Sequence, residues 1–284
     1  MQATQTVTFS APSYITVNGH RIAYEEVTPP MPKGTVVLIT GLASKRQGWR
    51  KQLPDFGQTY RTLVLDNRDI GDSDPVAEPY RTADQADDVA ALLRERGIDS
   101  ASVVGISMGG FIALELALRH PDLVEKLVLT STSAGGRTHV QPSWNITMLL
   151  LLPRLVPPFL RPEPGAAAKR TYARIMASDY CASHPDDWES IAEIARHNPQ
   201  PVAAYRRQLA ACQQHDAASR LGEIHVPTLI IHGAVDPLIP PANGVYLAEH
   251  IPGARLILYP DTGHIPIVER ATDYNRDVLA FLAE

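Results

Sequence analysis

Residues 101–120 read ASVVGISMGGFIALELALRH, and this stretch decides the fold. Its first six residues are small or apolar and predict a strand that is covered on both faces. The segment from Met108 to His120 has helical character, and Pro121 ends that helix. Between strand and helix stands Gly-Ile-Ser-Met-Gly, so Ser107 is expected at a sharp strand-to-helix turn.

The glycines around Ser107 have a physical reason. A serine at such a turn adopts a strained backbone conformation, and side chains two residues away would collide with the strand and the helix. Gly105 and Gly109 remove those collisions, and Gly110 lets the helix pack close to the sheet. The serine hydroxyl then stands at a helix N-terminus, where backbone N–H groups and the helix dipole favour negative charge. This context predicts that Ser107 is a nucleophile rather than an ordinary turn serine.

Strands and helices alternate on both sides of this turn. A hairpin is predicted over residues 14–27, with Asn18-Gly19 as its turn. Residues 82–96 have helical apolar spacing, with Thr82 expected as the N-cap and Gly97 as the stop. Apolar, β-branched runs predict further buried strands at 35–40, 61–66, 124–130, 228–232 and 255–259. Such alternation favours an α/β fold with a doubly wound, mostly parallel sheet.

The alternation stops between residues 133 and 223. No strong β run occurs there, and prolines at 142, 153, 157, 158, 162 and 164 separate short helical pieces. A helical lid, inserted before the last two strands, is the economical explanation. The sequence therefore predicts a core made of residues 1–132 and 224–284, with residues 133–223 as the lid.

A serine nucleophile needs a base, and the base needs an acid that orients it. His264 follows the strand at 255–259, and Asp236 follows the strand at 228–232. Both therefore fall on loops at the edge of the sheet that carries Ser107. After the strand at 124–130 only hydroxyl side chains are available, at 131–133, so no rival acid stands there. The predicted catalytic triad is Ser107, His264 and Asp236.

The segments Gly105 to Gly110, His232-Gly233-x-x-Asp236 and Gly263-His264 resemble the α/β-hydrolase superfamily, and the likeness covers nearly the whole chain. They are most similar to its esterase and lactonase branch, which includes 3-oxoadipate enol-lactonases. Residues 66–73 also resemble the D-x-R-D-x-G-x-S loop of aclacinomycin methylesterase-like enzymes. The resemblance implies hydrolysis of a carboxylic ester or lactone through an acyl-enzyme intermediate.

Two backbone N–H groups are expected to form the oxyanion hole. One belongs to Met108, the residue after the nucleophile. The other is assigned to Leu42, because relatives often read His-Gly-x-Gly where this chain reads Thr40-Gly41-Leu42-Ala43. The alternative second donor is the amide of Ala43 or of another residue in this loop.

The lid supplies the expected substrate-binding side chains. These are large and apolar, and we expect them to select by size and hydrophobicity. They are Trp144, Met148, Leu149, Phe159 and Met176. The apolar run at 148–152 can also be interpreted as a membrane-surface helix, but a pocket lining is favoured. Residues 66–73 and Glu269 are interpreted as structural support beside the site.

Composition excludes several other classes of function. The formal net charge is −5 without a Lys/Arg-rich block, so nucleic acid is not an expected partner. No metal-ligand cluster is visible, and no cofactor is expected. The N-terminal residues lack a secretory signal, and Cys181 and Cys212 are interpreted as reduced thiols. A cytoplasmic enzyme without stable membrane association, acting on a small ester or lactone, is predicted.

Three alternatives remain open. A haloperoxidase or perhydrolase of the same fold shares the triad but uses peroxide as acceptor. A carbon–carbon bond hydrolase needs cationic groups near a substrate carboxylate, for which Arg137 or Arg174 of the lid is available. A ligand receptor on a hydrolase scaffold binds tightly and turns over less than about once per minute, against the ~10 s⁻¹ typical of enzymes.

Overall fold

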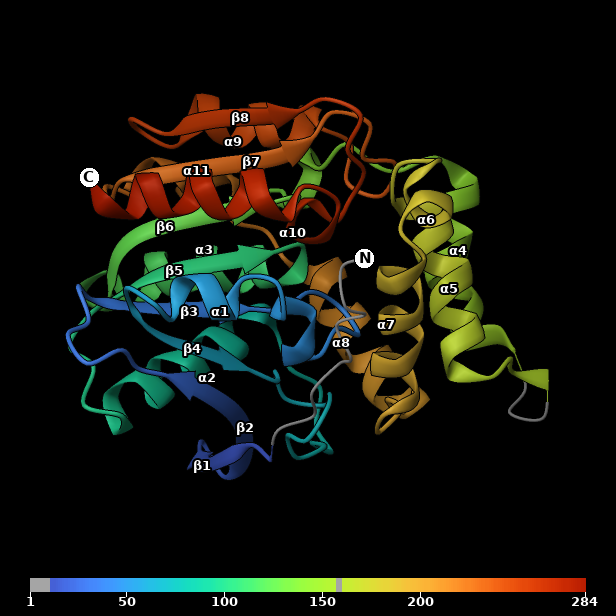
Figure 1. Ribbon diagram of the computed structural model, residues 1–284, viewed down its shortest axis with the longest axis horizontal. Helices are drawn as coiled ribbons and strands as arrows, with labels where there is room; N and C mark the ends of the chain where they lie inside the picture. The colour runs from blue at the N-terminus through green and yellow to red at the C-terminus, as the bar shows by residue number, and fades with distance from the viewer. Residues whose placement is uncertain (1–10, 157–159) are drawn as a thin grey trace.

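A twisted sheet forms the centre of the molecule (Figure 1). The computed structural model describes residues 11–156 and 160–284, and within them the sheet has eight strands in the order β1-β2-β4-β3-β5-β6-β7-β8. The first two strands pair antiparallel, as do β2 and β4, and all later neighbours are parallel. The strands are β1 (Ser13–Val17), β2 (His20–Val27), β3 (Thr35–Ile39), β4 (Arg61–Leu65), β5 (Ala101–Ile106), β6 (Val124–Thr130), β7 (Thr228–Gly233) and β8 (Arg255–Tyr259).

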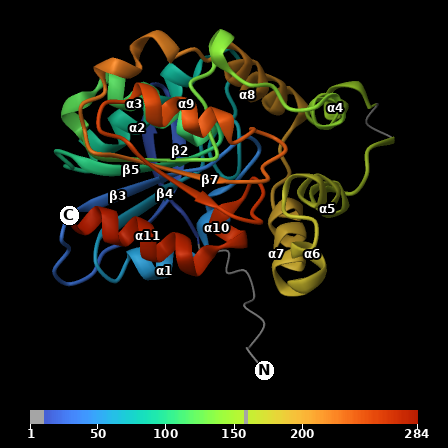
Figure 2. The same cartoon turned by 90° about the horizontal axis from the view of Figure 1, so that it is seen from above.

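Helices cover both faces of this sheet, as Figure 2 shows in a view along its edge. One face carries α2 (Thr82–Glu95), α3 (Met108–Arg119) and α9 (Ala242–His250). The other face carries α1 (Leu53–Phe56), α10 (Pro266–Glu269) and α11 (Ala271–Ala283). Each face encloses its own apolar cluster, and all six residues of β5 are buried between the two. The predicted doubly wound, mostly parallel sheet is confirmed.

The start of α2 differs from the prediction. Thr82 is the first helical residue, and Arg81 is the N-cap. The Asp84 carboxylate accepts the Arg81 backbone N–H at 2.7 Å, which takes over the capping role expected of Thr82. Thr82 Oγ1 instead lies 3.0 Å from His215 Nδ1, a partner brought in from far along the chain. Gly97 ends the helix as predicted, with a φ of +64°.

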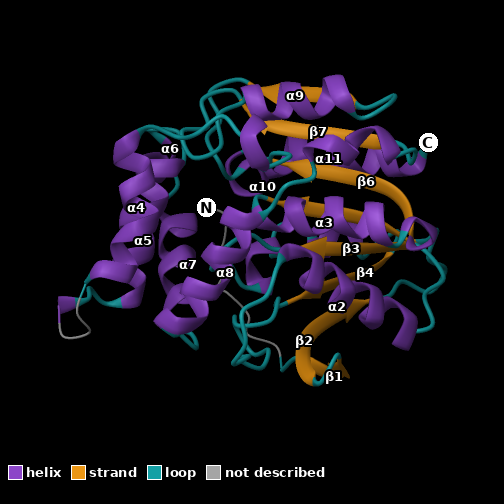
Figure 3. Cartoon of the chain, turned by 180° about the vertical axis from the view of Figure 1, so that it is seen from behind, coloured by secondary structure: helices purple, strands orange, loops and turns teal. Residues whose placement is uncertain are grey.

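The lid helices lie together beyond the carboxyl ends of the parallel strands (Figure 1). Figure 3 shows α8 between the other lid helices and the sheet. The helices are α4 (Trp144–Leu155), α5 (Pro164–Ile175), α6 (Tyr180–Ser183), α7 (Pro185–Arg196) and α8 (Val202–Gln214). All of them follow β6 and precede β7, so the lid lies at the edge of the sheet where the parallel strands end.

A short neck joins the lid to the core. Gly136 N–H donates to the His215 carbonyl at 2.9 Å, and Ala217 N–H donates to the Ala134 carbonyl at 2.8 Å. The next segment, Ala218–Glu223, is a 3₁₀ helix whose Leu221 is buried in the apolar cluster under α2, α3 and α9. This segment therefore packs with the core, and the division of the chain at 133 and 223 stays a prediction.

Two further observations concern the described residues as a whole. None of the helices in 11–156 and 160–284 has the length and apolar character required to cross a membrane. Cys181 and Cys212 are both free thiols.

Candidate active site

Ser107 adopts the strained conformation that its sequence context predicts. Its φ is +56° and its ψ is −121°, in a region that a non-glycine residue rarely occupies. A Cβ atom on Gly105 would overlap the Gly109 carbonyl, and one on Gly109 would overlap the Ile39 carbonyl. A Cβ on Gly110 would overlap the side chain of Thr132. The close approach of β5, α3 and their neighbours therefore explains each of the three glycines.

The predicted acid and base are in direct contact. Asp236 lies in the loop after β7, and its Oδ2 is 2.8 Å from Nδ1 of His264, in the loop after β8. Both side chains are almost fully buried. The loops are tied together by backbone bonds from Ala234 N–H to the Tyr259 carbonyl and from Val235 N–H to the Thr262 carbonyl. This arrangement can hold one imidazole tautomer, with the proton on Nδ1 and Nε2 free to accept.

The carboxylate of Asp236 is surrounded by donors. Its Oδ1 accepts the backbone N–H groups of Leu238 and Ile239 at 2.8 and 3.0 Å. Nε2 of His232 lies 3.4 Å from Oδ2 and donates to the Ile239 carbonyl at 2.8 Å. Burial alone would raise the pKa of Asp236, but the charge of His264 and the bonds from both imidazoles hold that pKa at about 2. The acid is therefore ionised at neutral pH.

The loop that carries His264 is fastened to the lid. Glu269 accepts the backbone N–H groups of Gly263 and Ile265, each at 2.9 Å, on either side of the histidine. The same carboxylate accepts Ala177 N–H of the lid at 2.8 Å, and His264 N–H donates to the Ile175 carbonyl at 2.7 Å. Glu269 thus has the supporting role that its position in the sequence indicates.

The loop after β3 runs beside the nucleophile. A Cβ atom on Gly41 would stand 3.2 Å from Cβ of Ser107, so the backbone at 41 is close enough to face the site. Ala43 N–H donates to Oε1 of Gln208 at 3.2 Å, which occupies the alternative second donor. Leu42 therefore remains the predicted donor from this loop, and Met108 is the first residue of α3.

The predicted substrate-binding residues of the lid are placed differently from one another. Met176 is buried directly after α5, and its backbone lies against Gly263, next to His264. Met148 and Leu149 are half-buried on α4, and Leu149 packs against the apolar cluster near α10 and α11. Trp144 is 74 % exposed and so does not line a closed pocket. Phe159 lies outside the described residues.

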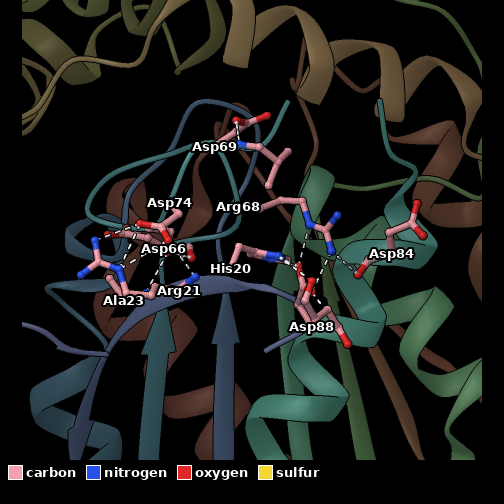
Figure 4. Close-up of polar contacts among 12 residues, drawn as sticks. His20, Arg21, Ala23, Asp66, Arg68, Asp69, Asp74, Asp84 and Asp88 are labelled. Atoms are coloured by element: carbon pink, nitrogen blue, oxygen red, sulfur yellow. Dashed lines mark hydrogen bonds and ion pairs between the residues drawn. The ribbon is translucent and has the colours of Figure 1, made fainter. Parts of the chain in front are cut away.

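Residues 66–73 form a hydrogen-bonded loop, as predicted. The buried carboxylate of Asp66 accepts Arg46 Nη1 at 2.5 Å and the backbone N–H groups of Arg46 and Asp72 at 2.7 and 3.0 Å. Arg68 extends from the same loop to Asp88 on α2, where both nitrogen–oxygen distances are 2.7 Å (Figure 4). These ion pairs anchor the loop to η1 (Arg46–Trp49) and to α2 beside the site.

Comparison with known proteins identifies the family to which this fold belongs. Residues 34–271 match the family model described as the alpha/beta hydrolase fold. The chain belongs to the α/β-hydrolase family. The crystal structure of the enol-lactonase from Burkholderia xenovorans LB400 is similar to this hydrolase, with a TM-score of 0.83 and 28 % sequence identity. The match covers 96 % of this chain and 100 % of the enol-lactonase chain.

Two curated relatives of this α/β hydrolase carry other names. The "Putative carbamate hydrolase RutD" of Serratia proteamaculans is 30 % identical over 256 residues, which are 90 % of this chain and 92 % of the relative. The "Putative non-heme bromoperoxidase BpoC" of Mycobacterium tuberculosis is 32 % identical over 252 residues, which are 87 % and 93 % of the two chains. The fold and these relatives indicate a hydrolase enzyme.

Sequence reasoning missed several residues that hold this hydrolase's site together. Gln208 lies on α8 among the buried residues Ala204 and Ala211, so a polar residue in an apolar helical stripe was the available signal. Lys45 is buried and donates to the carbonyls of Ile194, at 2.7 Å, and His197 at the end of α7. Nothing in the local sequence around Lys45 indicates these partners. The described residues contain no group of three or more His, Cys, Asp or Glu that could hold a metal ion.

Proposed function

We propose that this α/β hydrolase is a serine hydrolase that cleaves a carboxylic ester or lactone through an acyl-enzyme. The observation that carries the proposal is the buried hydrogen bond between Asp236 and His264, on the same sheet edge as the strained turn at Ser107. An ionised acid that fixes an imidazole is the support that a serine nucleophile needs.

The reaction runs in two halves. Ser107 Oγ attacks the carbonyl carbon while His264 Nε2 accepts the hydroxyl proton. The N–H groups of Leu42 and Met108 donate to the tetrahedral oxyanion. His264 then returns the proton to the leaving alkoxide: an ester releases its alcohol, whereas the new hydroxyl of an opened lactone stays on the acyl group. Water repeats the sequence on the acyl-enzyme, releasing the acid and restoring Ser107.

Apolar side chains near the base support a substrate that is recognised by size. Among the predicted lining residues, Met176 is buried and Met148 and Leu149 are half-buried. Arg137 and Arg174, the cations considered for a carboxylate of a carbon–carbon hydrolase substrate, are both exposed. This placement favours a neutral ester or lactone. The cytoplasmic location and the division of the chain at 133 remain predictions.

Labelling with a fluorophosphonate tests the nucleophile. Wild type should be modified at Ser107, and Ser107→Ala should lose both labelling and about 10³- to 10⁶-fold of kcat while it stays folded. Ser131→Ala is the matched control, because Ser131 is a buried serine at the end of the next strand whose hydroxyl has no bonding partner in the described residues. Labelling at another serine contradicts the assignment.

Substrate class is tested by kcat/KM on aryl esters, p-nitrophenyl esters, small lactones and macrolactones. Turnover below about one per minute on every compound supports the receptor alternative instead.

The bromoperoxidase relative supports one second candidate, perhydrolysis. Hydrogen peroxide takes the place of water in the second half-reaction, so the acyl-enzyme releases a peroxy acid and Ser107 is restored. Bromination of a dye by hydrogen peroxide and bromide in the presence of acetate measures this activity. A rate that disappears in Ser107→Ala supports perhydrolysis, and a rate equal to the enzyme-free background excludes it. The carbamate hydrolase relatives make aryl carbamates a further member of the substrate panel.

A further inference from the structure

Two of the three residues after Leu42 are bound by different lid helices. Ala43 N–H donates to Gln208 of α8, whereas the Ser44 hydroxyl donates to the Leu42 carbonyl within the loop at 3.4 Å. Lys45 Nζ donates to carbonyls at the end of α7. Residues 41–44 are here called the oxyanion loop. Contacts with the lid on this loop and on the adjacent Lys45 therefore help to hold it in position beside the site.

Gln208 makes the most specific of these contacts. Its side chain is fully buried, although it belongs to the lid. Its Oε1 accepts Ala43 N–H at 3.2 Å and Nε2 of Gln200 at 2.9 Å, and its Nε2 donates to the Arg68 carbonyl at 3.1 Å. Since Ala43 can only donate here and the Arg68 carbonyl can only accept, these partners fix the amide orientation. A buried amide with its bonds fixed in this way is rigid.

The backbone of the oxyanion loop requires such support. Ala43 has a φ of +56°, which is unfavourable for a residue with a Cβ and persists only where surrounding contacts hold it. Ala43 N–H shares its peptide group with the Leu42 carbonyl, and that group is joined at the Leu42 Cα to the peptide group that contains Leu42 N–H. A shift of the loop that breaks the bond to Gln208 therefore displaces the Leu42 Cα, and Leu42 N–H would no longer point at the developing charge beside Ser107.

We propose that Gln208 is a positioning residue that holds the oxyanion loop in its donor geometry and makes that geometry depend on the seating of α8. This proposal rests on the proposed serine hydrolase function and adds that the lid controls stabilisation of the oxyanion. Movement of α8 away from the core releases Ala43 and weakens the oxyanion hole. Closure of the lid then also completes the oxyanion hole.

Gln208→Met tests this role, because methionine has a similar length but makes no comparable bonds. Arg207→Met is the matched control: Arg207 on the same helix binds Asp69 at 2.7 and 2.8 Å but does not touch the oxyanion loop. On p-nitrophenyl acetate we expect Gln208→Met to lower kcat about 10- to 100-fold with KM within threefold of wild type, since the lost interaction acts in the transition state. Arg207→Met should keep kcat within threefold.

Three further readouts separate positioning from simple support of the fold. The inhibition constant of a trifluoromethyl ketone, which forms a tetrahedral adduct, should rise in proportion to the fall in kcat. Amide hydrogen exchange at residues 41–44 should become faster in Gln208→Met and stay unchanged in Arg207→Met. Gln208→Glu keeps an acceptor for Ala43 N–H but places a carboxylate oxygen against the Arg68 carbonyl, so it should recover only part of the lost kcat.

Two kinetic results would contradict the proposed role of Gln208. Equal losses in Gln208→Met and Arg207→Met, or a kcat of Gln208→Met within threefold of wild type, each overturn the role of Gln208. A wild type that is not labelled at Ser107 and hydrolyses no ester refutes the proposed reaction itself, and the role of Gln208 falls with it.

Discussion

Replacing Asp236 by asparagine changes the triad in a way that the structure determines. The side chain keeps its shape, and its oxygen must stay where Oδ1 now accepts the N–H groups of Leu238 and Ile239. The opposite orientation would leave two buried N–H donors facing an NH₂ group, at a cost of roughly 1–3 kcal/mol for each unpaired donor. The amide NH₂ therefore faces Nδ1 of His264.

This orientation puts the imidazole into the wrong tautomer. Nδ1 becomes an acceptor, the proton moves to Nε2, and His264 can no longer accept the proton of Ser107. The same substitution in a serine protease triad lowers kcat by about 10⁴, or ~5 kcal/mol of transition-state stabilisation, and we expect a loss of that size here. Folding should persist, with some loss of stability because the new NH₂ also faces Nε2 of His232 at the former 3.4 Å contact.

The assay is kcat on p-nitrophenyl acetate together with the melting temperature. Asp261→Asn is the matched control, since Asp261 is an exposed residue of the loop that carries His264 and has a positive φ that asparagine tolerates. It should keep kcat within twofold. More than a tenth of wild-type activity in Asp236→Asn would show that another group orients the histidine.

Two other predictions concern the buried His215 and the apolar side chains of the lid. Burial, with a smaller contribution from Arg220, lowers the pKa of His215 from its ordinary 6.5 to about 3. Between pH 6.5 and 3, His215 is protonated in the unfolded chain but neutral in the folded chain. The free energy of unfolding should therefore fall by about 4–5 kcal/mol as the pH is lowered through this range. His215→Gln should flatten that slope in denaturant titrations, and an unchanged slope would contradict the argument. In the lid, Met148→Ala and Leu149→Ala should change kcat/KM between bulky and short esters about tenfold, since pocket methylenes contribute roughly 1–3 kcal/mol; equal losses on all esters would mean that these side chains only support the fold.

The sheet and its order of elements could be predicted from local patterns. Buried strands such as β5 are continuously apolar, and Ser107 lies in a glycine pattern that only a tight strand-to-helix turn requires. Loops at the ends of parallel strands meet at one edge, which is why Asp236 and His264 could be paired from their positions alone.

The contacts between lid and core could not be predicted in this way. Thr82 has the residue type and position of an N-cap, yet tertiary folding gives its hydroxyl to His215 and the cap to Arg81 and Asp84. Trp144 has the composition of a pocket residue, but its exposure depends on how α4 sits on its neighbours. Side-chain bonds over more than a hundred residues, such as Gln208 to Ala43, leave no periodic signal in the sequence.

The neck at 134–136 and 215–217 gives the lid an entry and an exit that lie side by side. Because its two ends are adjacent, the lid can be replaced by another lid segment at the same two points without altering the order of the strands. Here the lid also carries the Gln208 amide that holds the oxyanion loop. A transplanted lid must therefore bring its own substitute for Gln208, and chimaeras lacking one should fold and bind yet turn over slowly.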